Sequence, residues 1–205
     1  MPRSGADARR RLQQAALQLY QERGYDATTT ADIAERAGVN DRTFFRHFPD
    51  KREVLFDGQN DLRDALVASV QAEPQGTTPV DALRRAFLAS AHILEANKDD
   101  GVTRLQIISR TPALSERDLA KGATMAAALA DTLHDRGEQR DAANLIAAVG
   151  WATFHHAATQ WIATPSANLR HLIASAFDLL TSLSAATPSS APFSVQQAHR
   201  ADAYQ

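Results

Sequence analysis

Apolar residues recur at helical spacing along almost the whole chain, and this periodicity limits the possible folds more than any other feature. Leu12, Ala15, Ala16, Leu19 and Tyr20 mark one such helical stripe. Stretches with the alternating pattern of a β-strand are nearly absent, and glycine or proline interrupts the helical pattern at intervals. The sequence therefore predicts an all-α fold of about nine helices.

The predicted helices lengthen after residue 50. We expect them near residues 51–73, 78–97, 101–110, 113–135, 139–163 and 166–186. Residues 187–205 lose the periodicity, so we expect them to form a disordered tail.

One segment, Ala142 to Leu169, contains no Asp, Glu, Lys or Arg and is long enough to span a bilayer. It contains Asn144, His155 and His156, however, and a pair of histidines in hydrocarbon is costly. We therefore expect a helix buried on nearly all sides in protein, and no membrane partner. The N-terminus has no apolar signal-peptide core and the chain has no cysteine, which is compatible with a cytoplasmic protein.

Charge is unevenly distributed along the chain. The net charge is −2, but residues 1–52 carry ten Lys or Arg and seven Asp or Glu, a local charge of +3. Locally basic segments favour nucleic acid as a partner even in a protein that is acidic overall.

Two short helices are predicted within this basic segment. In "TTTADIAERAG", Thr29 can cap a helix while Asp32 reaches back to it, and Gly38 can end that helix. Asn40 can cap the next helix, within "NDRTFFRHFPDK". The two helices and the turn between them predict a helix-turn-helix.

The second short helix has two distinct faces on a helical wheel. Phe44 and Phe48 lie only about 40° apart and define an inward face, whereas Arg42 and Arg46 point nearly opposite. So short a helix is not stable alone and needs the aromatic anchor. An anchored helix with a cationic outer face suits insertion into the major groove of DNA.

Residues 10–56 resemble the DNA-binding domain of the tetracycline-repressor (TetR) family, through "RGYDATTTADIAERAGV" and "RTFFRHFPDK". The later helices are similar in number and length to the ligand-binding and dimerisation domain of that family. The resemblance implies a three-helix helix-turn-helix domain at residues 1–50, a C-terminal helical ligand-binding and dimerisation domain at 51–186, and the tail.

The same resemblance implies which residues contact DNA. Thr30 and Lys51 match phosphate-contacting positions, and Lys51 also opens the helix that links the two domains. The start of the groove-facing helix is matched by Asn40, Asp41, Arg42 and Thr43. In the family, the next segment usually has the pattern Tyr-x-His. In this chain it consists of Phe45, Arg46 and His47.

Three positions leave alternatives open. Phe45 replaces the usual tyrosine and lacks its hydroxyl, although a phenyl ring can still touch a sugar or a thymine methyl. Asp41 is either a favourable charge at a helix N-terminus or an acceptor for a cytosine amino group. The run Arg9 to Arg11 precedes the first predicted helix and is either solvated or a flexible arm on DNA.

The two last long helices carry apolar stripes that suggest two kinds of contact. Trp151, Phe154 and Trp161 form one stripe of helix 139–163, and a second stripe lies on its other side. Helix 166–186 has an uninterrupted stripe from Leu169 to Leu183. We expect these two helices to form a homodimer interface.

The C-terminal helices also contain our candidates for ligand contacts. The candidate residues are Phe87, Arg104, Met125, Trp151, His155 and Trp161. His155 and His156 are adjacent and cannot share one helical face, and no HExxH spacing is present, so we expect no metal site and no cofactor.

These features predict a homodimeric transcriptional regulator, most simply a repressor, released from a palindromic operator by a small apolar or aromatic ligand. One alternative is a constitutive DNA-binding protein without an effector. Another is an enzyme with an appended helix-turn-helix. The chain has no glycine-rich phosphate loop and no GxSxG, so we expect it not to be an enzyme.

Overall fold

The computed structural model describes residues 3–164 and 166–185, and all regular structure within these ranges is helical. The elements are α1 Arg3–Arg23, α2 Thr30–Arg36, α3 Asp41–His47, the 3-10 helix η1 Glu53–Phe56, α4 Gln59–Ala72, α5 Pro79–Glu95, α6 Lys98–Arg110, α7 Pro112–Asp135, α8 Arg140–Ala163 and α9 Leu169–Ala185. The prediction of an all-α fold with about nine helices is confirmed. The predicted tail at 187–205 lies outside the described residues.

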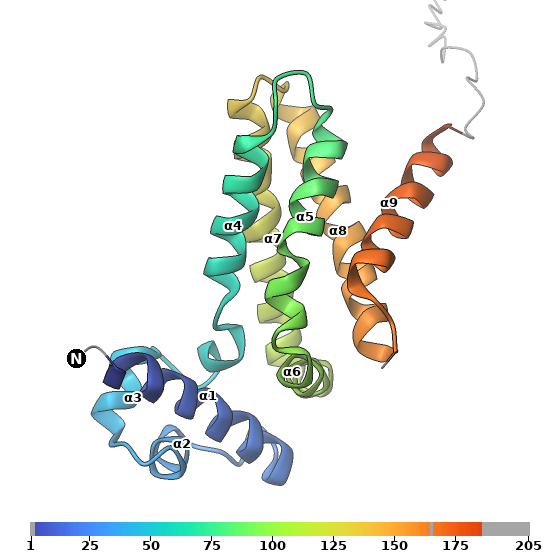
Figure 1. The fold of residues 1–205 in the computed structure, drawn as a ribbon. Coiled ribbons are helices and arrows are strands. Elements are labelled where there is room, and N and C mark those ends of the chain that lie inside the picture. Colours follow the sequence, from blue (N-terminus) through green and yellow to red (C-terminus); the bar gives the residue numbers. More distant parts are fainter. Residues whose placement is uncertain (1–2, 165, 186–205) are drawn as a thin grey trace, which may run out of the picture.

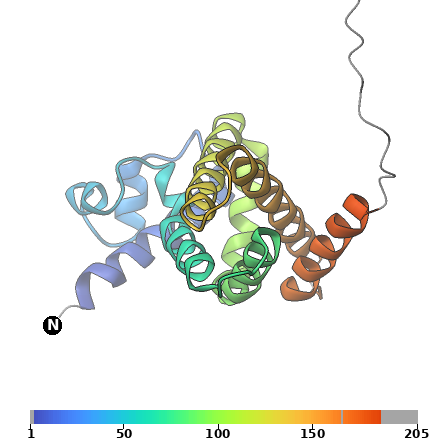
Figure 2. The same ribbon diagram turned by 90° about the horizontal axis from the view of Figure 1, so that it is seen from above.

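The helices form two parts, which we call the head (α1, α2, α3 and η1) and the bundle (α4 to α9). In Figure 1 the head lies below the bundle, with α1 close to the end of α6. Within the bundle, α7 packs on α4 and α8, and α9 packs on α5 and α8. Figure 2 shows the head and α9 on opposite sides of the bundle.

Each part has its own apolar core, and the head core extends into the bundle. The head core contains Phe44, which is completely buried, together with the three apolar residues of η1. Ile107 and Ile108 of α6 and Leu114 of α7 belong to this same cluster. The head is therefore held against α6 and α7 by apolar contact as well as by the covalent connection.

The predicted single helix over 51–73 is wrong, because the chain breaks between η1 and α4. Asp50 Oδ1 accepts hydrogen bonds from the amides of Arg52 and Glu53 at the start of η1. Asp57 is extended and Gly58 has a φ of 83°, a left-handed conformation that glycine adopts without strain. Apolar residues on both sides of the break are buried. The apolar pattern therefore continues across the break and does not reveal it. The domain boundary at residue 50 stays a prediction.

In the single chain, helix α8 is buried on one side only. The expectation of a helix buried on nearly all sides is therefore wrong for the single chain. Phe154 and Trp161 lie in the bundle core, but Leu145 is 66% exposed on the opposite side. Across the part of the chain that the structure describes, no helix is long and apolar enough to cross a membrane.

Candidate nucleic-acid interface

Side-chain caps fix the start of both short helices of the head. Thr29 Oγ1 accepts a hydrogen bond from the Asp32 amide at 3.1 Å, and Asp32 Oδ2 accepts one from the Thr29 amide at 2.8 Å. Asn40 Oδ1 accepts a bond from the Thr43 amide at 2.9 Å. Gly38, with a φ of 66°, forms the turn between the helices. The predicted capping box, turn and cap are therefore all present.

Helix α3 has the two faces that the wheel predicts. Phe44 and Phe48 are buried, whereas the side chain of Phe45 is 54% exposed. An open hollow of about 680 Å³ lies along the outer face. Its lining residues are Asn40, Arg42, Thr43, Phe45 and Arg46. The structure thus brings five of the nine predicted DNA contacts onto one concave surface, with two cations beside an exposed ring.

Two further predicted contacts lie at helix starts. Asp41 is exposed in the first turn of α3, where a negative charge is favourable next to the helix N-terminus. Thr30 is the first residue of α2 and is half-buried. Their roles in DNA contact stay predictions.

Lys51 is engaged within the head. Its Nζ donates hydrogen bonds to the carbonyl oxygens of Tyr25 and Thr28, both at 2.8 Å, and lies 3.5 Å from that of Asp26. The ammonium also lies 4.3 Å from the centre of the Tyr25 ring. All three donors of the lysine thus have partners in the turn before α2. This geometry favours a structural role for Lys51 in holding the turn. The phosphate contact that the resemblance implies would be a second role.

His47 is half-buried, and its Nε2 is buried without a hydrogen-bond partner. Burial lowers the pKa of His47, and the nearby charges of Arg46 and Arg9 lower it further. The imidazole is therefore neutral near pH 7, and Nε2 faces the protein interior.

The structure excludes a flexible arm at Arg9 to Arg11, because these residues lie inside α1. The Arg9 guanidinium bonds to both carboxylate oxygens of Asp57 and lies 5.0 Å from the centre of the Phe48 ring. Arg11 donates a 3.0 Å hydrogen bond to the carbonyl of Ala37. At least these two arginines stabilise the head from within.

Four predicted ligand contacts are core residues of the bundle or border it. Phe87, Met125 and Trp161 are buried, and the Phe87 ring stacks on Phe154 with centroids 4.5 Å apart. Trp151 is half-buried beside this pair, 6.4 Å from the Phe87 ring. These aromatic side chains pack on one another. Another hollow, of about 260 Å³, lies between α1 and α6.

The two polar ligand candidates lie around Asp118 of α7. His155 is exposed, with Nε2 4.0 Å from the Asp118 carboxylate. The Arg104 side chain is half-buried, and no hydrogen bond or ion pair joins it to another described residue. Burial lowers the pKa of Arg104, and the charges of Asp118 and Asp100 oppose that shift. The six candidates therefore separate into a packed aromatic group and an outer polar group.

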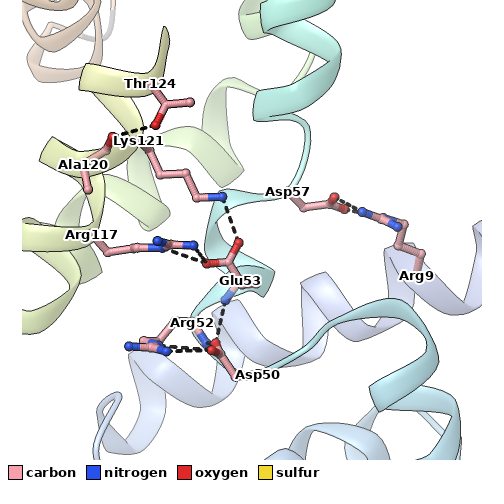
Figure 3. Close-up of polar contacts among 9 residues, drawn as sticks. All are labelled: Arg9, Asp50, Arg52, Glu53, Asp57, Arg117, Ala120, Lys121 and Thr124. Atoms are coloured by element: carbon pink, nitrogen blue, oxygen red, sulfur yellow. Dashed lines mark hydrogen bonds and ion pairs between the residues drawn. The ribbon is translucent and has the colours of Figure 1, made fainter. Parts of the chain in front are cut away.

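Sequence reasoning missed a polar network where the head meets the bundle (Figure 3). Glu53 bonds to Arg117 and Lys121 of α7, and Asp57 bonds to Arg9 of α1. These partners lie 64, 68 and 48 residues apart in sequence, so no local pattern could have revealed them.

Comparison with known proteins agrees with this geometry. The family described as bacterial regulatory proteins, tetR family, matches residues 12–57, and the MftR C-terminal domain matches residues 77–184. The regulator TcmR of Streptomyces glaucescens is 33% identical over 128 residues, covering 60% of this chain and 57% of TcmR. The chain spans about half the length of the curated relatives that it matches.

Solved structures extend the likeness to nearly the whole chain. FadR of Thermus thermophilus, a TetR-family repressor in complex with lauroyl-CoA, is 27% identical with a TM-score of 0.57, over 90% of this chain and 97% of FadR. A TetR-family protein of Syntrophomonas wolfei shares the fold, with a TM-score of 0.63 at 15% identity over 91% of this chain and 99% of that one. With one domain match over its head and another over most of its bundle, the chain belongs to the TetR family of DNA-binding transcriptional regulators.

Proposed function

We propose that this protein is a homodimeric, cytoplasmic repressor that binds a palindromic DNA operator and is released from it by a small ligand with a large apolar part. The observation that carries the DNA-binding role is the outer face of α3. Arg42 and Arg46 are exposed there without an ion pair to any described residue, beside the exposed ring of Phe45. Regulators of this family are not enzymes, in agreement with the expectation from sequence.

The physical chemistry of α3 suits duplex DNA. A helix anchored by buried Phe44 can enter the major groove without losing its own fold. Arginine can bond to both acceptors of guanine, and a phenyl ring can contact a thymine methyl. A two-fold dimer would place two such helices on successive grooves, about 34–36 Å apart.

The exposed apolar residues support a dimer through α8 and α9. Large hydrophobic side chains that are exposed in the described residues include Leu145 and Val149 on α8, and Leu179 and Leu183 on α9. Leu169 and Ile173, the first part of the predicted α9 stripe, are buried in the core of the same chain. The first part of the stripe therefore packs within the chain. We assign its later part to the contact with the proposed partner.

A charge at Leu179 tests this dimer, because that side chain is 58% exposed in the single chain. Leu179→Glu should give folded monomers by light scattering, since it would bury a charge only in the dimer. Ala176 is less suitable, because it also packs against the bundle core. A folded Leu179→Glu protein that remains dimeric would place the interface elsewhere.

The side chains of the bundle indicate the chemistry of the proposed ligand. FadR of Thermus thermophilus binds lauroyl-CoA, which combines an apolar chain with a polar head. In this chain the aromatic group around Phe87 and Trp151 could open to an apolar chain or ring, and half-buried Arg104 could meet a polar end. A bundle that admits no ligand would instead support the constitutive alternative.

A two-stage experiment tests the function. Selection from a random duplex library should yield a palindrome whose binding weakens steeply with salt. Lauroyl-CoA, lauric acid and a panel of apolar aromatics are then added, with tryptophan fluorescence and operator release measured together. Compounds that change fluorescence without changing DNA affinity would leave a binding protein without a switch. Failure to select any sequence would contradict specific DNA binding.

A further inference from the structure

The 3-10 helix η1 carries acidic residues at its two ends, and they bond to opposite parts of the molecule (Figure 3). Glu53, at its start, bonds to α7 of the bundle: Oε1 accepts from Arg117 Nε at 2.9 Å and Oε2 from Lys121 Nζ at 2.8 Å. Asp57, directly after its end, bonds to α1 of the head through Arg9 and through Gln13 Nε2 at 2.6 Å.

We infer that Glu53 is a positioning residue for DNA binding: its bonds to Arg117 and Lys121 set the angle between head and bundle, and Asp57 transmits that angle to α1. The consequence for DNA binding rests on the proposed dimeric repressor, in which that angle determines the separation of the two α3 helices. The angle itself is a property of the single chain and can be measured without DNA.

Apolar contact alone does not fix this angle. The head meets α6 and α7 through Ile107, Ile108 and Leu114, and the attraction between apolar surfaces is non-directional. Charge-assisted hydrogen bonds have a preferred geometry, and each oxygen of the Glu53 carboxylate receives a different cation. The ionic contacts therefore supply orientation that the apolar contacts lack, together with the 3.3 Å hydrogen bond that Gln21 Nε2 of α1 donates to Thr103 Oγ1 of α6.

The Glu53 network is sheltered enough to act as a stable contact. The Glu53 side chain is 18% exposed and that of Lys121 is 23% exposed, so solvent and salt screen the pair less than a surface pair. Burial alone would raise the pKa of Glu53, but the bonds and charges of Lys121 and Arg117 outweigh it and lower the pKa. The carboxylate is therefore ionised near neutral pH.

The second half of the link is also anchored. The Asp57 side chain is 11% exposed, and its partner Arg9 lies over the ring of Phe48, the residue directly after α3. A change in the position of η1 thus acts on α1 and on the base of the groove-facing helix together.

The bundle end of the network adjoins the aromatic core. Gly122, the residue after Lys121, packs so closely on Trp151 that an added Cβ would lie 2.9 Å from the indole Nε1. A ligand that displaces Trp151 would therefore move α7 next to the Glu53 contact. Because α7 is a continuous helix, a displacement at Gly122 also displaces Lys121.

Intramolecular distances test the inference directly. The chain has no cysteine, so Ala31→Cys on α2 and Ala127→Cys on α7, both exposed positions, allow selective spin labelling. Labelled chains are mixed with an excess of unlabelled chains, and the distance distribution is measured by pulsed electron paramagnetic resonance. Glu53→Gln in this background should shift or broaden the distribution relative to the parent.

Glu73→Gln is the matched control. Glu73 is 15% exposed and bonds to Arg85 at 2.9 Å, but both residues belong to the part of the chain after α4 begins. This substitution should leave the distance distribution unchanged. If Glu53→Gln folds and gives the parental distribution, the inference is overturned. If it does not fold, Arg117→Gln, which alters a 42% exposed side chain, gives the same test.

Operator spacing provides the functional readout. On duplexes that carry the selected half-sites at a series of separations, Glu53→Gln should reduce the preference for the best separation about fivefold. The preference for the half-site sequence should stay unchanged, and the effect of Glu53→Gln should shrink when Lys121 is already glutamine. An equal loss at every separation would show a merely structural role. Absence of binding by the parent protein would instead contradict the proposed function, while the distance measurement still decides the inference.

Discussion

The head and the bundle use their side chains in different ways. In the head, polar side chains cap α2 and α3 and secure the turn before α2, and the cations of α3 remain exposed. In the bundle, the large aromatic side chains pack on one another, and the polar candidates Arg104 and His155 lie around Asp118 of α7. The head therefore presents a formed surface, whereas a ligand site in the bundle depends on how the packed helices can separate.

This contrast explains why the two parts differ in how clearly they indicate function. A groove-facing surface is made by one short helix, so a few consecutive residues specify it. A ligand pocket is enclosed by side chains from several helices, and its shape depends on all of them. Four experiments test this contrast between head and bundle.

The largest expected effect is on the anchor of α3. Phe44→Ala removes a completely buried ring from the head core and should lower the free energy of unfolding by about 3–5 kcal/mol. Phe45→Ala, at the next position, should change it by less than about 0.5 kcal/mol but weaken DNA binding. Chemical denaturation and DNA titration measure the two effects. A large loss of stability in Phe45→Ala would mean that this ring is buried in solution.

Lys51→Ala should lower the free energy of unfolding by about 1–3 kcal/mol, because it removes charge-assisted bonds to the carbonyls before α2. Arg52→Ala, at an exposed neighbouring cation, serves as the control. If Lys51 acts only through the turn, the slope of log affinity against log salt is the same in the variant and the parent. A slope reduced by about 1 would establish the phosphate contact that the resemblance implies.

Arg42→Ala should relax selectivity at one base pair of each half-site, with a change of about 1–3 kcal/mol in discrimination. Arg110→Ala removes the same charge from an exposed position on α6 and should leave selectivity unchanged. Binding to single-base variants of the selected operator provides the measurement. Equal losses on every sequence would assign Arg42 to a phosphate and leave base reading to its neighbours.

The smallest effect concerns pH. The pKa of His47 lies below its ordinary value of 6.5, so the unfolded chain takes up a proton before the folded one. The resulting stability is complete above about pH 6.5 and is lost as the pH falls toward the lowered pKa. His47→Gln should reduce this pH dependence of urea unfolding. An unchanged profile in His47→Gln would mean that His47 is solvated.

Much of the head follows from local sequence. The Thr29–Asp32 capping box, the Asn40 cap and the opposite placement of Phe44 and Arg42 were all predictable, because caps and helical faces depend on residues within one or two turns. The break at Asp57–Gly58 was not, since apolar periodicity continues on both sides of it. Nor could the sequence decide whether Arg9 to Arg11 are a solvated run or a flexible arm, because Arg9 lies inside α1 and has a partner 48 residues away.

Local sequence patterns are enough to predict that the chain is helical and that it carries a helix-turn-helix with a cationic outer face. Which charged residues are free to meet DNA, and which hold the protein together, depends on the tertiary contacts. Lys51, Arg9 and Glu53 bond to partners 23 to 68 residues away. Helical periodicity records which side of a helix faces a core, but not which helix it meets. Contacts between helices depend on the packing of the whole chain, and that packing placed Glu53 between the head and the bundle.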